Sequence, residues 1–400
     1  MTTFTAPEKV DILVSGGGIA GLLAAAAFGH AGFSVHCVDP TPPVVQESED
    51  GADLRSTCFL QPSIKVLEDT GLWSRLAPYA TPLKVMRIVD AGGRRPEPRL
   101  SREFDAAEIS DQPFGWNVPN WVLKREISGQ LESLANVRFE TGVGTRDVLP
   151  RADDAIVTLT DGRHIAAKLV VAADGRFSAV REALGIGAKT IRYGQKALAF
   201  AVTHEDPHHN VSTEVHRSGG PFTLVPLPDR DGKHSSAVVW LDRGPEIQRL
   251  AALSREDFAV EMNRRSAGIY GLLTQATRLT VWPIISQIAD RYSGPRTALI
   301  AEAAHVLPPI GAQGLNMSLA DLAALLELSK DDPGSPESLA AYARRRHPEA
   351  LARVMGIDAL NRASMAGPRP LRDLRAGLLG TLYAHGPVRR LMMKAGLGAK

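Results

Sequence analysis

Cysteine is scarce in this 400-residue chain, which contains only Cys37 and Cys58 and no CxxC pair. A disulfide framework or a thiolate metal site is therefore not expected, and a reducing cytosol fits. Long apolar runs are missing too, since the segment LLAAAAF near the N-terminus is far too short to span a bilayer. The opening MTTFTAPEKV lacks the cationic and apolar regions of a signal peptide, so we expect a cytoplasmic protein.

The chain also lacks a strong charge of either sign, because 46 Lys and Arg stand against 44 Asp and Glu, a net charge of +2. This balance gives no reason to expect a nucleic-acid partner. Residues 362–400, however, hold eight Arg or Lys and one acid, so this tail carries +7 and the rest about −5. Such a tail indicates an anionic surface or partner. The length predicts two domains, each with its own core.

The segment VDILVSGGGIAGLLAAAAFGHAGFSVHCVDP predicts a strand, a glycine-rich turn, a helix and a second strand. In the turn, Gly16 allows a tight bend, Gly18 lets the backbone approach a pyrophosphate, and Gly21 allows close helix–strand packing. The helix start would hold the pyrophosphate, and Asp39 would bind ribose hydroxyls. An aspartate there argues against a 2′-phosphate, so the motif indicates NAD or FAD. The alternative is a glycine-rich turn in another kind of α/β unit.

Two later segments favour FAD. Residues 168–185, KLVVAADGRFSAVREALG, form another apolar strand that ends at Asp174, with Arg181 in a following helix. Residues 301–327, AEAAHVLPPIGAQGLNMSLADLAALLE, place the acid Glu302 before a Pro/Gly turn and an Ala/Leu helix. We do not expect a simple NAD dehydrogenase to carry both segments after an N-terminal GxGxxG.

The three segments together resemble the FAD-dependent aromatic monooxygenases of the para-hydroxybenzoate hydroxylase fold, and within them the ubiquinone-biosynthesis hydroxylases. In that family the third motif reads roughly GD-A-A-H-x-x-x-P-x-x-G-Q-G-x-N, which is matched here by Ala303, Ala304, His305, Pro309, Gln313, Gly314 and Asn316. Less generic matches are YGQKALAFAVTHEDPHHN, GPFTLVPLP, SSAVVWL and LRAGLLGTLYAHGPVRRLMMKAGLG. These stretches cover most of the chain.

The chain departs from the family pattern at several positions. Glu302 stands where Asp is usual, Ala301 and Ala312 stand where Gly is usual, His216 replaces a frequent Phe, and Asn120 replaces a frequent Arg or Gln. Glu302 keeps a carboxylate, one methylene longer, so we still expect it to bind ribityl hydroxyls.

The resemblance implies that the third segment lies against the flat flavin ring, which the backbone must approach closely. Pro308 and Pro309 would stiffen this turn, and Gly311 and Gly314 would permit conformations that a β-carbon forbids. A helix expected from Ser318 would direct its positive N-terminal end towards the ring's pyrimidine edge, where the reduced flavin is anionic. The alternative is a Pro/Gly loop before a helix, with its acid and its histidine merely solvated.

Residue by residue, the resemblance implies cofactor contacts at Gly16, Gly18, Gly21, Asp39, Arg55, Asn120, Val143, Asp174, Glu302, Pro309, Gly311, Gly314, Leu315 and Asn316. The candidate catalytic residues are Arg55, His305 and Pro309. Arg55 is expected near flavin and substrate, the alternative being a surface arginine. His305 is either a proton donor or a structural residue that orients the loop. No metal site is expected, since His204, Glu205, His208 and His209 read as solvated turn residues.

The expected fold is α/β, with a discontinuous Rossmann-like FAD-binding domain, an inserted antiparallel-sheet substrate domain and a C-terminal helical segment. Residues 1–80, 101–190 and 281–360 are assigned to the FAD-binding domain, 81–100 and 191–280 to the substrate domain, and 361–400 to a basic amphipathic tail. Strand-like runs at 84–90, 196–203, 212–217, 221–227 and 235–241 predict the inserted sheet. Phe222, Leu224 and Pro226 are expected to line its substrate pocket.

In the tail, Leu371, Leu374, Leu378 and Leu382 recur at helical spacing, while the basic residues lie mainly on other faces. Such a helix fits peripheral contact with the inner face of a membrane, where a polyprenylated substrate resides. Packing of this face onto the protein's own body is an equally supported alternative.

The resemblance implies an aromatic-ring hydroxylase in ubiquinone biosynthesis, which acts on a lipophilic polyprenyl-phenol or quinone precursor and works with partners of that pathway. FAD, reduced by NAD(P)H or a partner reductase, would react with O₂ to give a C4a-hydroperoxide that transfers oxygen to the ring. No second GxGxxG occurs, so NAD(P)H would bind transiently. Two alternatives remain open: a hydroxylase of a small soluble phenol, and a non-catalytic FAD-binding subunit of a biosynthetic complex.

Overall fold

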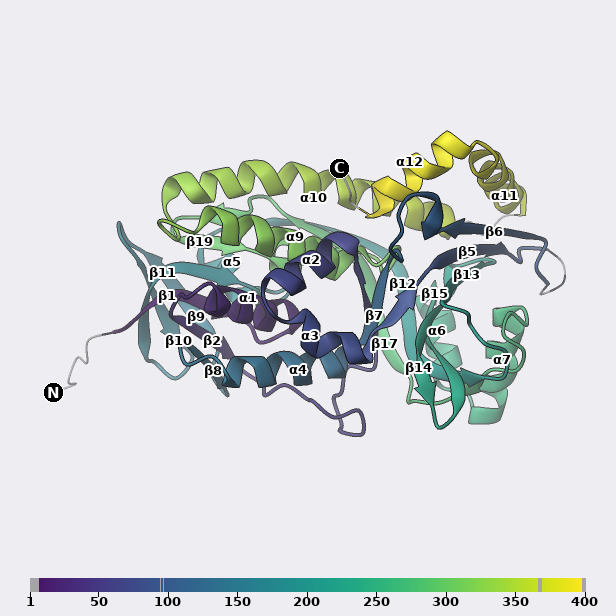
Figure 1. The fold of residues 1–400 in the computed structure, drawn as a ribbon, viewed down its shortest axis with the longest axis horizontal. Helices are drawn as coiled ribbons and strands as arrows, with labels where there is room; N and C mark the ends of the chain where they lie inside the picture. The colour runs from purple at the N-terminus through teal and green to yellow at the C-terminus, as the bar shows by residue number, and fades with distance from the viewer. Residues whose placement is uncertain (1–6, 94, 96, 366–368, 398–400) are drawn as a thin grey trace.

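The computed structural model describes residues 7–93, 95, 97–365 and 369–397. Its cofactor half is built on a mixed sheet (Figure 1). Five of its strands are parallel neighbours in the order β8-β2-β1-β11-β19, the arrangement of a dinucleotide-binding sheet. Its strands are β1 (Glu8–Ser15), β2 (Val35–Asp39), β8 (Val137–Thr141), β9 (Thr145–Pro150), β10 (Ala155–Leu159), β11 (His164–Ala172), β18 (Ser293–Gly294) and β19 (Thr297–Leu299).

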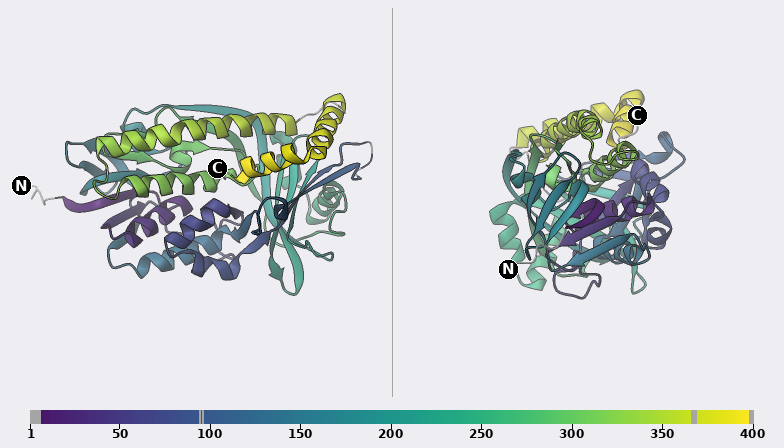
Figure 2. Two further views of the ribbon diagram at one scale, coloured as in Figure 1. Left: turned by 45° about the horizontal axis from the view of Figure 1, so that its top comes forward. Right: turned by 90° about the vertical axis from the view of Figure 1, so that its left-hand side faces the viewer.

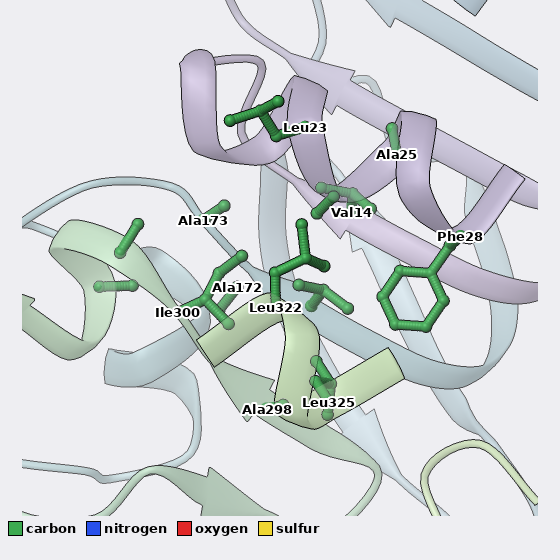
Figure 3. Close-up of a cluster of buried hydrophobic side chains, with 14 of the residues drawn as sticks. Val14, Leu23, Ala25, Phe28, Ala172, Ala173, Ala298, Ile300, Leu322 and Leu325 are labelled. Atoms are coloured by element: carbon green, nitrogen blue, oxygen red, sulfur yellow. The ribbon is translucent and has the colours of Figure 1, made fainter. Parts of the chain in front are cut away.

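The largest core lies between this sheet and the helices that cover it. Helix α1 (Ile19–His30) has five Ala and two Leu among its twelve residues and is buried over most of its length, so it packs closely on β1. Beside α1, helix α9 (Gln313–Leu328) brings Leu322 and Leu325 into the same buried cluster as Ala172 and Ile300 (Figure 3). The ends of β1, β11 and β19, which carry the three sequence motifs, thus share one core.

A second sheet forms the substrate half, in the order β20-β17-β12-β15-β14-β13-β5-β6, with β16 beside β12. Its strands are β5 (Val85–Asp90), β6 (Leu100–Asp105), β12 (Ala188–His204), β13 (Val211–His216), β14 (Pro221–Arg230), β15 (Lys233–Arg243), β16 (Thr274–Gln275), β17 (Thr280–Ala289) and β20 (His305–Val306). All neighbours are antiparallel except β13 and β5, which run parallel. The five expected strand runs all lie in this sheet.

The sheet pairing places two segments differently from the expected domain boundaries. β17 was assigned to the cofactor domain from residue 281 onwards, but it pairs with β12 in the substrate sheet. β6 was assigned to the cofactor domain from residue 101, but it pairs with β5. Hydrophobic periodicity predicts a strand but not the strand with which it pairs. The sequence therefore does not show where the chain passes from one half to the other.

Phe222 and Leu224 do not line a pocket but lie in the core under α6 (Gly244–Ala251) and α7 (Arg255–Ser266), with Trp240 and Phe258. Side chains alternate between the two faces of a strand, so the next residue, Val225, points to the opposite face and joins a different apolar cluster. Phe222 and Leu224 are therefore core residues of the substrate half.

A small third sheet joins the two halves, with β7 (Gly115–Pro119) between β3 (Ser56–Leu60) and β4 (Thr81–Leu83). The remaining helices are α2 (Gln61–Asp69), α3 (Trp73–Leu76), α4 (Asn120–Glu132), α5 (Ala179–Ala183), α8 (Ala301–Ala304), α10 (Pro336–Ser364), α11 (Arg369–Ala384) and α12 (Gly386–Leu397), with 3₁₀ turns at Ala77–Tyr79 and Ala106–Glu108. None of the helices in the described ranges combines the length and apolar character needed to cross a membrane.

The C-terminal helices fold back over the molecule, and α12 lies along α10 (Figure 2). Met393 and Leu397 are buried against the body, and Arg389 pairs with Glu108 at 2.7 Å. The tail therefore packs on the protein through α12, which lies outside the leucine face described in the sequence. On α11 the side chains of Leu374 and Leu382 remain exposed, whereas those of Leu371, Arg375 and Leu378 lie outside the described part of the chain.

Candidate functional site

The glycine loop after β1 has the geometry that its three glycines predict. Gly16 has a φ of +109°, a conformation that favours glycine, and a β-carbon there would lie 2.4 Å from the carbonyl oxygen of Ala173. A β-carbon on Gly21 would lie 1.8 Å from the carbonyl oxygen of Gly16, so glycine is needed for close packing of α1. A β-carbon on Gly18 would meet nothing within 4 Å, and Gly18 is exposed. The loop is thus closed on its inner side and open at Gly18.

Asp39 holds this loop from the end of β2. Its carboxylate accepts hydrogen bonds from the backbone N–H of Gly17 at 2.5 Å and from the N–H and hydroxyl of Thr41 at 2.8 and 2.9 Å. The backbone N–H of Val143 donates to the carbonyl of Asp39 at 3.3 Å. Two predicted cofactor residues therefore meet at the loop's edge, where a ribose would follow a pyrophosphate.

Asp174 lies at the end of β11, beside the glycine loop. One carboxylate oxygen accepts the backbone N–H of Val180 at 3.1 Å, while the other is buried and has no partner. Burial raises the pKa of this carboxyl, against hydrogen bonds from Ser178 and Val180 that lower it. A buried acceptor without a donor costs roughly 1–3 kcal/mol, so this oxygen fits a ligand that brings a hydroxyl or N–H.

Arg181 connects the second motif with the third. Its guanidinium donates to the carbonyl of Ala303 at 2.8 Å and to that of Arg176 at 2.7 Å. Ala303 belongs to α8, the short turn after β19 that also presents the exposed Glu302. Because β1, β11 and β19 are neighbours, their motifs meet at one edge of the sheet, as expected for parallel strands.

The third motif holds two alanines in left-handed conformations, Ala301 with φ +53° and Ala312 with φ +55°. Positive φ favours glycine, so both positions hold a backbone shape that glycine would adopt without strain. Helix α9 begins at Gln313, five residues before the expected start at Ser318. Gly314 and Leu315 are therefore in its first turn, where backbone N–H groups are unpaired and the positive dipole end lies.

Asn316 does not face outwards from this helix start but fastens it to β3. Its amide donates to the carbonyl of Cys58 at 2.8 Å and accepts the backbone N–H of Leu60 at 2.8 Å. Pro309, Gly311 and Gly314 are exposed on the same segment. The exposed residues of the turn are therefore free to contact a ligand, whereas Asn316 anchors the turn to β3.

Arg55, just before β3, is held by several contacts at once. It donates two hydrogen bonds to Asp53, at 2.8 and 2.7 Å, and its guanidinium carbon lies 4.1 Å from the ring centroid of Trp282. Burial acts to lower the pKa of Arg55, but the hydrogen bonds and charge of Asp53, together with the charge of Glu302, outweigh it and raise that pKa. Asn120 donates to the same Asp53 carboxylate at 2.9 Å. Two predicted site residues thus share one half-buried acid.

His305 is buried behind the turn. One ring nitrogen lies 2.8 Å from the carboxylate of Asp321 on α9, and Asp321 also accepts from Arg346 on α10 at 2.8 Å. The other ring nitrogen is buried without a partner. Its position ties β20 to the two helices, which is the geometry of a residue that orients the turn.

The expected turn histidines are engaged in hydrogen bonds within the substrate sheet. His204 bonds the carbonyl of Asp206 and the hydroxyl of Ser236, and His208 bonds the carbonyl of Leu227. Among the residues that the structure describes, no group of three or more His, Cys, Asp or Glu side chains could hold a metal ion.

Three observations test whether FAD fits this site. The glycine loop is open where a pyrophosphate must approach. A buried carboxylate oxygen of Asp174 has no hydrogen-bond donor. The first turn of α9 lies next to the exposed Pro/Gly turn that precedes it. A dinucleotide with a ribityl chain and a flat ring supplies a partner for each. The residues present therefore fit FAD.

Comparison with known proteins agrees with this geometry. Residues 9–356 match the model of the FAD binding domain family. The chain is 32% identical to ubiquinone hydroxylase UbiL of Rhodospirillum rubrum over 99% of this chain and 91% of that protein. It is 26% identical to the 3-demethoxyubiquinol 3-hydroxylase of Escherichia coli, covering 98% and 99% of the two chains.

The chain belongs to the ubiquinone-biosynthesis family of FAD-dependent monooxygenases. Its fold is shared with the p-nitrophenol 4-monooxygenase PnpA of Pseudomonas putida, with a TM-score of 0.76 at 19% identity over 98% of this chain and 99% of that one. This protein is therefore an FAD-dependent aromatic hydroxylase that uses O₂, on the para-hydroxybenzoate hydroxylase fold.

Sequence reasoning missed four members of this hydroxylase site: Asp53, Trp282, Asp321 and Arg346. Asp53 stands two residues before Arg55, and this spacing alone does not predict that the two side chains form an ion pair. The other three reach the site from separate elements, and a single sequence contains no signal of such long-range contacts.

Proposed function

We propose that this hydroxylase acts on a phenol or quinone precursor of ubiquinone that carries a polyprenyl chain. The observation that supports this is an apolar cluster next to the third motif, in which the buried side chains of Met393 and Leu397 from the tail meet Leu60 of β3 and the partly buried Ala312 of the turn. Phe104 and Val225 from the substrate half also belong to this cluster, as does Phe114 just before β7. Apolar side chains gathered beside the turn suit a lipophilic substrate.

In this proposal, bound FAD supplies the oxygen activation, and the chain's own residues supply binding, orientation and dryness. Gly18 would leave room for the pyrophosphate, Asp174 would accept a hydrogen bond from a cofactor hydroxyl, and the first turn of α9 would stabilise negative charge on the ring. Arg55, fixed by Asp53 and Trp282, holds a positive charge at the boundary of the two halves. We assign His305 to positioning of the turn through Asp321.

The experiment supplies FAD-loaded protein with NAD(P)H, ¹⁸O₂ and either a geranyl-substituted phenol or the same phenol without a chain. We expect one ¹⁸O atom in the hydroxylated prenyl product, measured by mass spectrometry. Hydroxylation of the chain-free phenol alone would instead support a small soluble substrate. No oxygen incorporation with any donor, including a separate reductase, would favour the non-catalytic subunit of a biosynthetic complex.

We also propose that the enzyme reaches its substrate from an anionic membrane surface through α10, α11 and α12. The supporting observation is that the described part of these helices exposes eight large apolar side chains: Leu351, Met355, Leu360, Leu374, Leu382, Val388, Leu391 and Met392. Arg390 and Lys394 are exposed on α12 beside them. Apolar side chains flanked by basic ones are typical of helices that lie in a membrane interface.

Vesicle sedimentation tests this surface. We expect the protein to sediment with vesicles that contain phosphatidylglycerol and less with pure phosphatidylcholine. The double variant Leu391→Gln, Met392→Gln should lose most of this binding, whereas Val260→Gln, Leu272→Gln should not, because these two exposed apolar residues lie elsewhere on the molecule. Equal binding by both variants would contradict the assignment of the surface.

A further inference from the structure

A cavity of about 110 Å³ lies at the junction of α2, α9, α10 and α12, directly behind the start of α9. Gln313 and Asn316, from the first turn of that helix, form one part of its wall. The complete lining is Leu60, Pro62, Ser63, Gln313, Asn316, Met317, Ala320, Arg346, Glu349, Ala350, Arg353 and Leu397. For comparison, an apolar protein cavity of about 150 Å³ holds benzene, so this space can take a small apolar group or a short piece of chain.

The apolar part of this wall continues into the cluster beside the third motif. Leu60 and Leu397 line the cavity and also belong to that cluster, which reaches Ala312 in the turn. Met317, Ala320 and the fully buried Ala350 extend the apolar side within the cavity. The cavity and the apolar cluster beside the third motif thus share two side chains and adjoin each other.

The charged groups of the cavity are already paired, so they do not call for an ionic ligand. Arg346 bonds the carboxylates of Asp321 and Glu349, and Arg353 donates to the carbonyl of Ala395 at 2.9 Å. With Asp321 included, two arginines face two acids, and the set is neutral. Burial lowers the pKa of Arg353, with the like charge of Arg346 acting in the same direction.

Helix α12 forms one side of this space through Leu397. The side-chain amide of Gln313 donates to the carbonyl of Gly396 at 3.0 Å, next to the bond from Arg353 to Ala395. The end of the tail is therefore attached directly to the first turn of α9. A chain held in the cavity would lie between these attachments and the apolar side chains of α9 and α10.

We propose that this cavity is a subsite for an aliphatic chain, filled by part of the polyprenyl group of the substrate while its ring is at the flavin. This inference rests on the proposed lipophilic substrate. It adds that the tail residue Leu397 and the α9 residues Met317 and Ala320 select for the chain, and that α12 forms the outer wall of the substrate site.

A cavity-filling substitution tests the subsite without leaving a hole in the fold. Ala320→Leu adds apolar volume into the cavity, and Ala323→Leu adds the same volume one turn later on α9, where Ala323 lines a separate cavity. The kinetic readout is kcat/KM for a phenol with a farnesyl chain divided by kcat/KM for the same phenol without a chain. FAD content and thermal midpoint are measured in parallel to exclude misfolding.

We expect Ala320→Leu to lower this ratio by roughly tenfold or more, since a methylene that no longer fits a pocket costs on that scale, and Ala323→Leu to leave it unchanged. An unchanged ratio in both variants would overturn the subsite while leaving the proposed function intact. If the unsubstituted enzyme hydroxylates neither phenol, the proposed function itself fails.

Ligand binding without turnover distinguishes the possible occupants. Farnesol, an isoprenoid alcohol without an aromatic ring, should raise the thermal midpoint of the FAD-loaded protein and of Ala323→Leu but not of Ala320→Leu. Lauric acid is the matched probe for the straight chain of a membrane lipid, and a shift with lauric acid alone would assign the cavity to lipid and overturn the substrate subsite. A shift with inorganic phosphate alone would also overturn it.

Discussion

The guanidinium carbon of Arg55 lies 4.1 Å from the ring centroid of Trp282, so a residue just before β3 stacks on one from the substrate sheet. The same guanidinium makes two hydrogen bonds to Asp53, whose pKa is lowered because the bonds and charge of Arg55 outweigh the burial that would raise it. This arrangement fixes one positive charge where the cofactor and substrate halves meet.

Replacing Arg55 by lysine should therefore impair catalysis although the charge remains. A lysine cannot bind Asp53 through two parallel bonds or stack in the same way on Trp282. We expect kcat to fall by roughly tenfold to a hundredfold in steady-state assays, with bound FAD retained, because misplacement of a positioning group costs on this scale. Arg163→Lys is the matched control, since Arg163 binds two carboxylates on an exposed part of the surface. A kcat equal to that of the control would show that Arg55 does not belong to the catalytic site.

Two glycine substitutions should separate cofactor binding from folding. In Gly18→Val the new side chain extends into open space, so we expect a folded protein with the thermal midpoint of the apoprotein and no flavin absorbance. In Gly21→Ala the new β-carbon would collide with the carbonyl of Gly16, so the helix must move away from β1 and the free energy of unfolding should fall by about 1–3 kcal/mol. Circular dichroism and the visible spectrum report both effects. A yellow Gly18→Val protein would refute the assignment of this loop.

The left-handed alanines predict a gain in stability. Ala312→Gly should raise the free energy of unfolding by up to about 1 kcal/mol, because an alanine with positive φ is strained and a glycine is not. Ala323→Gly, in the interior of α9, should lower it by about 1 kcal/mol through helix propensity. Chemical denaturation midpoints measure both. Destabilisation of the two variants by equal amounts would show that residue 312 carries no strain.

FAD affinity should depend on pH through Asp174. Burial raises the pKa of this carboxyl in the apoprotein, so the folded apoprotein takes up its proton above the ordinary value of 3.8 and gains stability as the pH falls through the raised pKa. A cofactor hydroxyl donates to the ionised form, so the affinity for FAD should weaken over the same pH range as the proton binds. Fluorescence titrations of FAD measure this. Asp174→Asn should flatten the dependence, and a slope that persists in this variant would assign it to another group.

His305→Leu should distinguish positioning from proton transfer. Leucine has no donor for Asp321, which leaves a buried carboxylate with Arg346 alone, so we expect the free energy of unfolding to fall by roughly 1–3 kcal/mol. The pH profile of kcat should keep its shape, because the ring is turned towards α9 and α10. A large loss of kcat at unchanged stability would instead make His305 the proton donor.

Much of the cofactor half could be predicted from the sequence, because its signals are local. Gly16, Gly18 and Gly21 between a strand and a helix specify a phosphate-binding turn through backbone conformation alone, and Asp174 and the third motif follow their strands in the same way. Parallel strands gather such ends at one edge, so the sequence itself determined the fold class, the cofactor and the family.

Only the tertiary structure decided which groups complete the site. Trp282 reaches Arg55 because β17 belongs to the substrate sheet, and Asp321 reaches His305 because β20 passes behind α9, neither of which any spacing records. Leu397 lies against Leu60 because the tail folds back across the molecule. Periodicity shows which face of a helix is apolar, but the partner of that face is chosen by the packing of the whole chain, which buries the most apolar surface only once all elements are in place.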